Sequence, residues 1–91
     1  MELLFRNSFY RDWDELRSKN LNKAIQEITH RIKRMDSISQ IPRMKQLRRS
    51  DYEYKIELRV QTKIYWILCD ANGNKIIFTR IKSETWCKKN I

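Results

Sequence analysis

The sequence predicts an α+β fold in which an N-terminal strand and a helical hairpin precede a three-stranded antiparallel meander. Residues 51–60 alternate between polar and apolar side chains, the pattern of a strand with one buried face. Residues 62–70 are apolar on both sides, as expected of an inner strand. Residues 21–35 repeat apolar side chains at helical spacing. We therefore expect residues 1–91 to form a single domain, with the helices packed on one sheet face.

The N-terminal part of the chain should form a strand and two helices. Met1–Arg6 has the character of a short strand, and Ser8 is expected to cap a helix from residue 9 to about residue 18. Asn20 is expected to cap a second helix that reaches about residue 35. The apolar positions expected to face the core are Phe9, Trp13 and Leu16 in the first helix, and Leu21, Ala24, Ile25, Ile28, Ile32 and Met35 in the second.

A connector and three strands should complete the chain. Pro42 interrupts regular structure within residues 37–50, where Met44 and Leu47 would anchor the segment to the core. The strands should span about residues 52–60, 62–69 and 75–81. Turns at Gln61-Thr62 and at Asn72-Gly73, the latter a strong hairpin signal, would join them. These turns would pair Leu58 with Tyr65, Arg59 with Ile64, Cys69 with Ile76, Ile67 with Phe78, and Tyr65 with Arg80.

Such a sheet would have two different faces. The face covered by the helices would carry Tyr54, Ile56, Leu58, Tyr65, Ile67 and Phe78. The second face would carry Lys55, Arg59, Ile64, Trp66, Leu68, Ile77 and Ile81. Because the second face is both apolar and basic, it needs a cover. The C-terminal tail with Trp86, another protein chain and nucleic-acid bases are all candidates.

The charge of the chain favours a polyanionic partner. The net charge is +9, and residues 21–50 alone carry eight basic and two acidic groups. Clustered positive charge is typical of proteins that bind nucleic acid or an acidic protein, although a merely soluble basic surface is the alternative. Cys69, Cys87 and His30 have no metal-site spacing, so we expect structural roles and neither metal nor cofactor. No apolar run approaches the roughly 18 residues of a membrane span, and we expect a cytoplasmic protein.

Several local sequences resemble those of one protein family when they are taken in order. These are FRNSFYRDWDEL at 5–16, IPRMKQLR at 41–48, YKIELR at 54–59, IYWIL at 64–68 and IIFTR at 76–80. In order and spacing the chain resembles the RelE/ParE superfamily, the toxins of bacterial type II toxin–antitoxin modules. The resemblance covers nearly the whole chain and implies a RelE-like fold.

The resemblance also implies a function and its partners. It implies a toxin that is neutralised by a cognate acidic antitoxin protein in a hetero-oligomer. Many RelE-like members cut messenger RNA on the ribosome without a metal ion, which makes a ribosome-dependent mRNA endonuclease that inhibits translation the first expectation. The ribosome and mRNA would then be further partners. The alternative is a ParE-like gyrase poison, or a degenerate toxin, that acts by protein binding without catalysis.

Four residues are candidates for catalysis. The resemblance carries over Lys55, Arg59 and Arg80 as basic residues of the family's active face. Glu57 lies between the first two on the same strand face and is a candidate base for the ribose 2′-OH. The alternative is a row of salt bridges on a solvated face. Glu57 stands where RNA-cutting members often have lysine, and this departure favours the non-enzymatic alternative.

Six further residues are candidates for RNA binding. Basic residues of the connector would contact phosphates, and basic residues near the strand ends would support them. Trp66 stands where the family usually has arginine; it would stack on a base, or pack against Trp86 or an antitoxin helix. The full set of RNA-binding candidates is Lys45, Arg48, Arg49, Lys63, Trp66 and Lys82.

Overall fold

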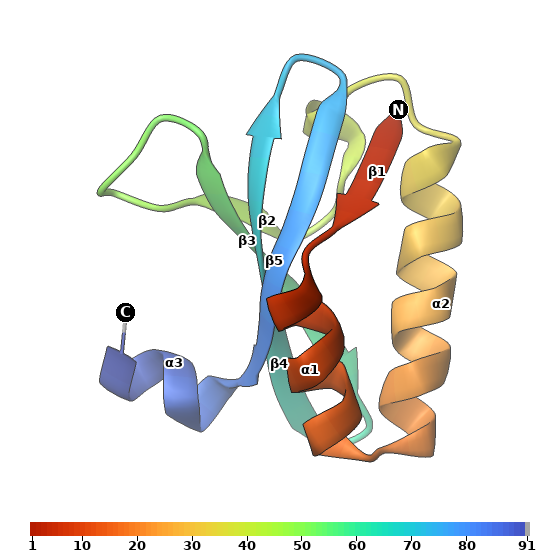
Figure 1. The fold of residues 1–91 in the computed structure, drawn as a ribbon, viewed down its shortest axis with the longest axis vertical. Helices are drawn as coiled ribbons and strands as arrows, with labels where there is room; N and C mark the ends of the chain where they lie inside the picture. The colour runs from red at the N-terminus through yellow and green to blue at the C-terminus, as the bar shows by residue number, and fades with distance from the viewer. Residues whose placement is uncertain (91) are drawn as a thin grey trace.

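The computed structural model describes residues 1–90 as a five-stranded mixed sheet with helices on both faces (Figure 1). The elements are β1 (Glu2–Phe5), α1 (Asn7–Leu16), α2 (Lys19–Lys33), the 3-10 helix η1 (Ile38–Gln40), β2 (Met44–Gln46), β3 (Glu53–Val60), β4 (Lys63–Asn72), β5 (Lys75–Ser83) and α3 (Glu84–Asn90). The predicted α+β class is confirmed. None of the described helices is long and apolar enough to cross a membrane.

The sheet is larger than the predicted meander. Its strand order is β1-β5-β4-β3-β2, and β3, β4 and β5 form the expected antiparallel meander. β1 lies beside β5 and runs parallel to it, so that the first and last strands are neighbours. β2 comes from the connector and adds an antiparallel edge to β3. The predicted description, a strand, a helical hairpin and then a three-stranded meander, therefore differs from the observed strand order, because β1 and β2 extend the meander at its two edges.

The two hairpins differ in how well their register was predicted. Leu58 lies opposite Tyr65 and Arg59 opposite Ile64, as expected. In the second hairpin Cys69 lies opposite Phe78, because Gly73 and Asn74 make the turn between the paired Asn72 and Lys75. The predicted turn was thus one residue too early. Gly73 has φ 63°, a left-handed conformation that glycine adopts at little cost.

A bulge changes the register again further along the second hairpin. The pairing shifts between Leu68 and Cys69, so that Arg80 faces Leu68 and Thr79 is the extra residue of β5. A shift of one residue turns the following side chains to opposite faces. Ile81 therefore lies in the core opposite Ile67, and not on the second face as predicted. Tyr65 faces Ser83 in place of the predicted Arg80.

The predicted helix caps were wrong, although the helices exist. α1 begins at Asn7, and Ser8 donates its hydroxyl to the carbonyl of Thr79 at 2.6 Å. Ser18, not Asn20, caps α2 by accepting the N–H of Leu21 at 3.2 Å. The left-handed Arg17 ends α1 and leaves room for only a short turn, so α2 starts earlier than the sequence pattern indicates.

The main core lies between the sheet and the pair α1 and α2. The α2 stripe buries Leu21, Ile25, Ile28 and Ile32 against the sheet, as its spacing predicts. Phe9 of α1 is fully buried, and its ring centroid lies 5.4 Å from that of Phe78. Trp13 and Leu16 are partly buried at the edge of the core. The covered face of the sheet is thus the predicted one.

α3 is a helix that the sequence analysis did not predict, and it lies on the sheet face opposite to α1 and α2. Its contacts with the sheet are to β4 and β5. Trp66, Leu68 and Cys87 are buried, but they lie outside the main core cluster. The C-terminal tail, one of the three candidate covers for the second face, therefore covers part of it as α3.

Candidate nucleic-acid interface

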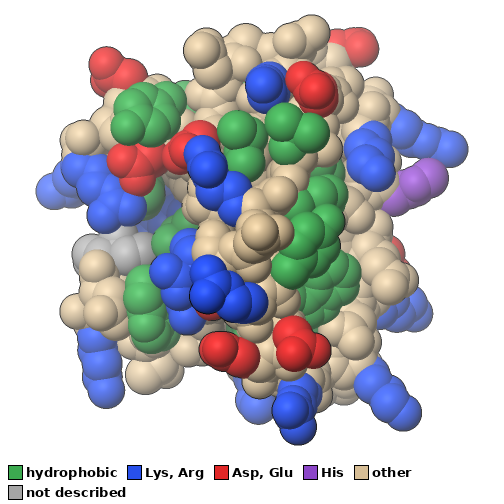
Figure 2. Space-filling model, in the orientation of Figure 1, with side chains coloured by type: hydrophobic (Ala, Val, Ile, Leu, Met, Phe, Trp, Pro, Cys, Tyr) green, Lys and Arg blue, Asp and Glu red, His purple; other side chains and the backbone are tan. Residues whose placement is uncertain are grey.

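A basic groove lies on the second sheet face, between the loop before β3 and α3. It is a hollow of about 620 Å³. Its lining residues are Lys45, Gln46, Leu47, Arg48, Arg49, Lys55 and Asn90. Figure 2 shows Lys and Arg side chains gathered on this flank, at the left of the view, with acidic and apolar side chains above them. The groove brings together four of the predicted site residues from separate parts of the sequence.

The pairing of β2 with β3 builds this groove. Lys45 of β2 lies directly opposite Lys55 of β3, which places two like charges side by side. The buried Leu47 fixes the end of β2, and its N–H donates to the carbonyl of Glu53 at 2.8 Å. The loop between them exposes Arg48 and Arg49. Like charges held this close favour the binding of an anion that neutralises them.

Only part of this charge is neutralised within the chain. Arg49 pairs with Glu53 at 2.8 Å, but more than half of its side chain stays exposed. Exposed ion pairs of this kind contribute little to stability and exchange easily for another anion. Among residues 1–90, Lys45, Arg48 and Lys55 form no salt bridge. Their charges are therefore available to a ligand.

Trp66 lies next to the groove, beneath the ammonium groups of Lys45 and Lys55. The Lys55 ammonium lies 4.3 Å from its ring centroid, and the Lys45 ammonium 5.9 Å, so both make cation–π contacts. Only 5% of Trp66 is exposed. Trp66 is therefore buried, and in this conformation it presents no open face to a base. Its predicted packing against Trp86 or an antitoxin helix stays a prediction. Base stacking by Trp66 stays a prediction.

Glu57 and Arg59 lie on the same sheet face as Lys55, one and two rows further along. Glu57 accepts a hydrogen bond from the Arg59 Nε at 2.5 Å, a single ion pair within β3 and not the cross-strand row of salt bridges that was the alternative to catalysis. Glu57 also lies opposite Trp66 in the register.

Arg80 and Lys82 are held by Asp12 of α1. Arg80 donates from Nε and one terminal nitrogen to Asp12 at 2.6 and 3.2 Å, and the Lys82 ammonium lies 3.0 Å from the same carboxylate. The N–H of Ile81 donates to it as well, at 3.2 Å. These residues line a separate hollow of about 310 Å³ together with Ser8, Arg11 and Glu15. The predicted catalytic set is therefore divided between two places.

The charge state of this cluster follows from its contacts. Burial by itself raises the pKa of Asp12, but hydrogen bonds from Arg80, Lys82 and the Ile81 N–H outweigh it and hold the pKa below 3.8. The hydrogen bond to Asp12 raises the pKa of Arg80. Asp12 and Arg80 are therefore charged near neutral pH. Asp12 fixes the two cations in place and also reduces their charge toward a ligand.

Lys63 lies away from the basic groove, where the β3–β4 hairpin meets the start of α3. It lines a hollow of about 520 Å³ with Leu16, Thr62, Ile64, Tyr65, Ser83, Glu84 and Thr85. Lys63 and the basic groove would therefore contact different parts of an RNA ligand.

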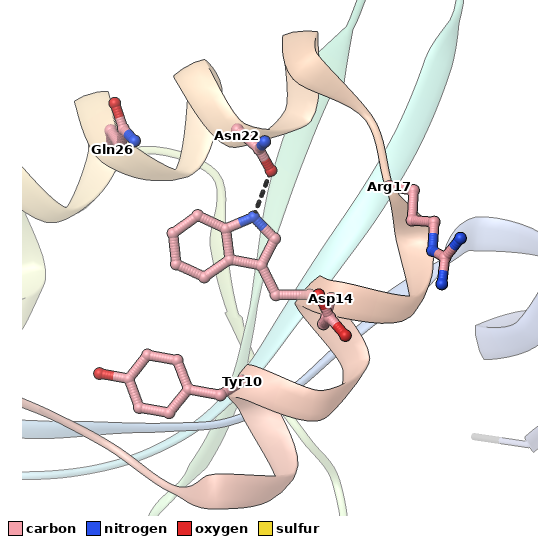
Figure 3. A pocket seen from close by; sticks show the side chains of 6 residues that line it. Tyr10, Asp14, Arg17, Asn22 and Gln26 are labelled. Atoms are coloured by element: carbon pink, nitrogen blue, oxygen red, sulfur yellow. Dashed lines mark hydrogen bonds between the residues drawn. The ribbon is translucent and has the colours of Figure 1, made fainter.

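A fourth hollow lies between α1 and α2 and has a different character (Figure 3). Its volume is about 340 Å³, and its lining residues are Tyr10, Trp13, Asp14, Arg17, Asn22 and Gln26. The Trp13 Nε1–H donates to Asn22 at 2.6 Å, which ties the two helices together. Figure 3 shows Tyr10 beside this pair, and 49% of Tyr10 is exposed. Because its lining has one cation and one anion, this hollow lacks the excess positive charge of the basic groove.

Neither cysteine thiol is accessible for chemistry in this folded conformation. Both are buried, and burial raises the pKa of the Cys69 and Cys87 thiols. At Cys87 the positive charges of Lys55 and Lys82 act in the opposite direction and the negative charge of Glu84 in the same direction. No group of three or more His, Cys, Asp or Glu within residues 1–90 is arranged to hold a metal ion.

Sequence reasoning missed two parts of this region. Asp12 follows Phe9 by three positions and precedes Leu16 by four, so it lies on the apolar stripe of α1, and a charge there signals a buried partner. α3 also had a signal, because Ser83 precedes the helix and accepts the N–H of Trp86 at 3.2 Å as a cap. Neither residue belonged to the predicted site.

Comparisons with known proteins support the fold. No family model matches the sequence, and the search of curated proteins gives no match. Among solved structures, one chain of the RelB–RelE antitoxin–toxin complex from Methanococcus jannaschii has a similar fold, with a TM-score of 0.75 and 24% identity. The similarity covers 94% of this chain and 95% of that chain. The class that the fold defines is therefore an α+β domain of the kind found in that complex.

Proposed function

We propose that this chain is the toxin component of a toxin–antitoxin system and that it inhibits translation by binding RNA in the basic groove. The observation that carries the proposal is the groove itself, in which Lys45, Arg48, Arg49 and Lys55 converge on a hollow of about 620 Å³. Four phosphate-binding side chains on one face are the footprint of a nucleic-acid ligand. The similar fold of a chain in an antitoxin–toxin complex supports the toxin–antitoxin part.

The proposed activity is metal-independent cleavage of messenger RNA on the ribosome. Such cleavage needs a base for the 2′-OH, cations for the phosphate and an acid for the leaving oxygen. Glu57 would act as the base after Arg59 turns from it to the phosphate, and Lys55 would bind the same phosphate. Arg80, held in position by Asp12, would stabilise the charge that develops during cleavage. The Lys55 ammonium would donate a proton to the leaving 5′ oxygen, so that the P–O5′ bond breaks as the 2′ oxygen closes a cyclic phosphate.

The proposed protein partner is a cognate acidic antitoxin. The second sheet face combines the basic groove with exposed apolar side chains at its other end, where Leu4 is 39% and Tyr52 55% exposed. An acidic, partly disordered peptide that folds on binding would neutralise the charges and cover the apolar groups. Its binding would block the groove, which gives a physical reason for neutralisation.

Induced expression followed by mapping of messenger RNA ends tests the activity. We expect growth arrest with codon-linked cuts, and loss of both in the double variant Lys55→Ala with Arg59→Ala. The matched control is Lys23→Ala with Arg31→Ala, which removes two exposed cations from α2 on the opposite side of the sheet. Cleavage that persists in the first variant, or is lost equally in the control, would contradict the proposed roles.

A non-enzymatic toxin, such as a ParE-like gyrase poison, is the second candidate. It is favoured by the two ion pairs that hold the predicted catalytic residues, Glu57 with Arg59 and Arg80 with Asp12. The same expression experiment separates the two candidates. Intact messages together with DNA damage would favour gyrase poisoning, and healthy cells would indicate a degenerate toxin.

A further inference from the structure

α3 crosses the second sheet face from β5 to the basic groove. Ser83, which immediately precedes α3, lies opposite Tyr65 of β4, while Asn90 at the end of α3 lines the groove. Between these points the helix packs on β4 and β5. Trp66 is 5% exposed there, Leu68 7% and Cys87 5%, although none of them belongs to the main core. α3 therefore closes a small apolar layer of its own.

The attachment of α3 to this layer is weak. It has seven residues, and a helix of this length is marginal unless packing holds it. Among residues 1–90, the polar contacts of its side chains stay local: Ser83 with the Trp86 N–H, Asn90 with the Trp86 carbonyl, and Lys82 with the Trp86 ring at 5.1 Å. Segments held by few apolar contacts open locally far more often than the core.

The surface beneath α3 has the chemistry of a nucleotide site. Trp66 lies within 6 Å of two ammonium groups, since the Lys55 Nζ is 4.3 Å and the Lys45 Nζ 5.9 Å from its ring centroid. An aromatic ring beside phosphate-binding cations is the arrangement that holds unpaired bases in single-stranded nucleic acid. A double-stranded ligand offers no free base face to such a ring.

We propose that α3 is a displaceable cover over a base-stacking subsite, in which Trp66 takes an unpaired nucleobase while Lys45 and Lys55 bind the adjoining phosphate. The subsite rests on the proposed RNA binding in the groove and adds that the ligand is single-stranded RNA and that α3 must move. RNA that binds only the open form draws α3 away from Trp66. The groove and the subsite then form one continuous site.

The two cysteines report on this movement in the unmodified protein. Cys87 lies on α3, whereas Cys69 is 1% exposed in the main core. Iodoacetamide labelling, followed by mass spectrometry of the peptides, gives the rate at each thiol separately. We expect Cys87 to react about tenfold or more faster than Cys69, because Cys69 requires a larger unfolding event. Saturating single-stranded oligouridylate should increase the Cys87 rate by about tenfold and leave Cys69 no faster.

A parallel binding measurement by fluorescence anisotropy separates the possible failures. If oligouridylate binds and depends on Lys45 and Arg48, but the Cys87 rate stays unchanged or falls, the subsite is refuted and the RNA-binding groove stands. If no oligouridylate binds, both proposals are refuted.

A pair of tryptophan variants tests the same point without labelling. Trp66→Leu should weaken oligouridylate binding by about tenfold, since it removes the stacking surface. Trp86→Leu should loosen α3, because it removes the contact with Lys82, and should strengthen binding while increasing the Cys87 rate. Should Trp66→Leu fail to fold, the second variant still decides: unchanged or weaker binding in Trp86→Leu would overturn the proposal.

Discussion

Replacing Asp12 with asparagine removes the charge that links α1 to the end of β5 while it keeps the shape of the side chain. The Asp12 side chain is 6% exposed and accepts hydrogen bonds from Arg80, Lys82 and the Ile81 N–H. Asparagine has one acceptor oxygen, and its amide would point N–H groups at a cation. The variant therefore loses at least one charge-assisted hydrogen bond and gains an unfavourable contact.

The size of the effect follows from the exposure of the partners. Removing one member of a fully buried ion pair costs about 3–5 kcal/mol. The Arg80 side chain is 41% exposed, so water can solvate its charge once Asp12 is neutral, whereas Lys82 is 18% exposed and less able to compensate. Hydrogen bonds to charged groups contribute about 1.5–3 kcal/mol. We expect Asp12→Asn to lower the free energy of unfolding by about 2–3 kcal/mol.

Urea denaturation followed by circular dichroism measures this difference. The midpoint should fall while the slope of free energy against urea stays the same, since the folded and unfolded surfaces are unchanged. Asp14→Asn is the matched control, because Asp14 is exposed on the same helix. The control should change stability by about 0.5 kcal/mol or less. Equal midpoints for the two variants would refute the stabilising role of the Asp12 cluster.

The remaining predictions concern pH, salt and the turn of the second hairpin. The folded-state pKa of Asp12 lies below 3.8. The contribution of the Asp12 carboxylate to the free energy of unfolding is therefore complete above pH 3.8 and is lost as the pH falls through the folded-state pKa. The wild type should lose its stability advantage over Asp12→Asn only in that acid range. Four phosphate contacts should make the logarithm of the RNA affinity fall with the logarithm of the salt concentration with a slope of about −3. The double variant Lys45→Ala with Arg48→Ala should bring this slope to about −1.4. Equal slopes for the wild type and the variant would show that these residues do not contact phosphate. Gly73→Ala should cost about 1 kcal/mol in urea denaturation through its φ of 63° alone, since nothing lies within 4 Å of an added Cβ, and Gly73→Asn should cost less.

The parts of the fold that the sequence predicted are those set by a long and regular pattern. The α2 stripe and the β3–β4 register each rest on many residues that agree, so a shift by one position would bury several polar groups. The predicted register of the second hairpin depended on the position of a single turn. Asn72-Gly73 and Gly73-Asn74 are nearly equivalent as turn sequences. Tertiary pairing decided between them.

The parts that escaped prediction depend on contacts between distant residues. β2 has three residues and little pattern, and it is a strand because it pairs with β3. The basic groove exists because that pairing sets Lys45 opposite Lys55, so the sequence could name its cations but not their convergence. The ion pairs of Glu57 and Arg80 likewise depend on side-chain geometry that no spacing along the chain determines.

The bulge at Thr79 connects the core with the candidate site. If Thr79 took an ordinary place in the ladder and the register that pairs Cys69 with Phe78 continued, Arg80 and Lys82 would turn toward the core and Ile81 toward the second face. The extra residue reverses this, so that Ile81 is fully buried and both cations reach Asp12. One irregular residue therefore allows β5 to be apolar inside and basic outside at the end where it meets α3.

Thr79 can be tested by truncating it and by deleting it. Thr79→Ala keeps the bulge and loses one hydrogen bond, from its hydroxyl to the Leu68 carbonyl at 3.0 Å, which should cost about 1 kcal/mol. The deletion removes the extra residue, so that Arg80 still lies opposite Leu68 and Ile81 opposite Ile67 in a regular ladder, with both cations outside the core. The deletion also loses the hydrogen bond that the Thr79 carbonyl accepts from the Ser8 hydroxyl at 2.6 Å, so we expect it to cost about 2 kcal/mol while unfolding in urea stays cooperative. A deletion variant that loses cooperative unfolding would mean that β5 requires the bulge itself and cannot form a regular ladder with β4.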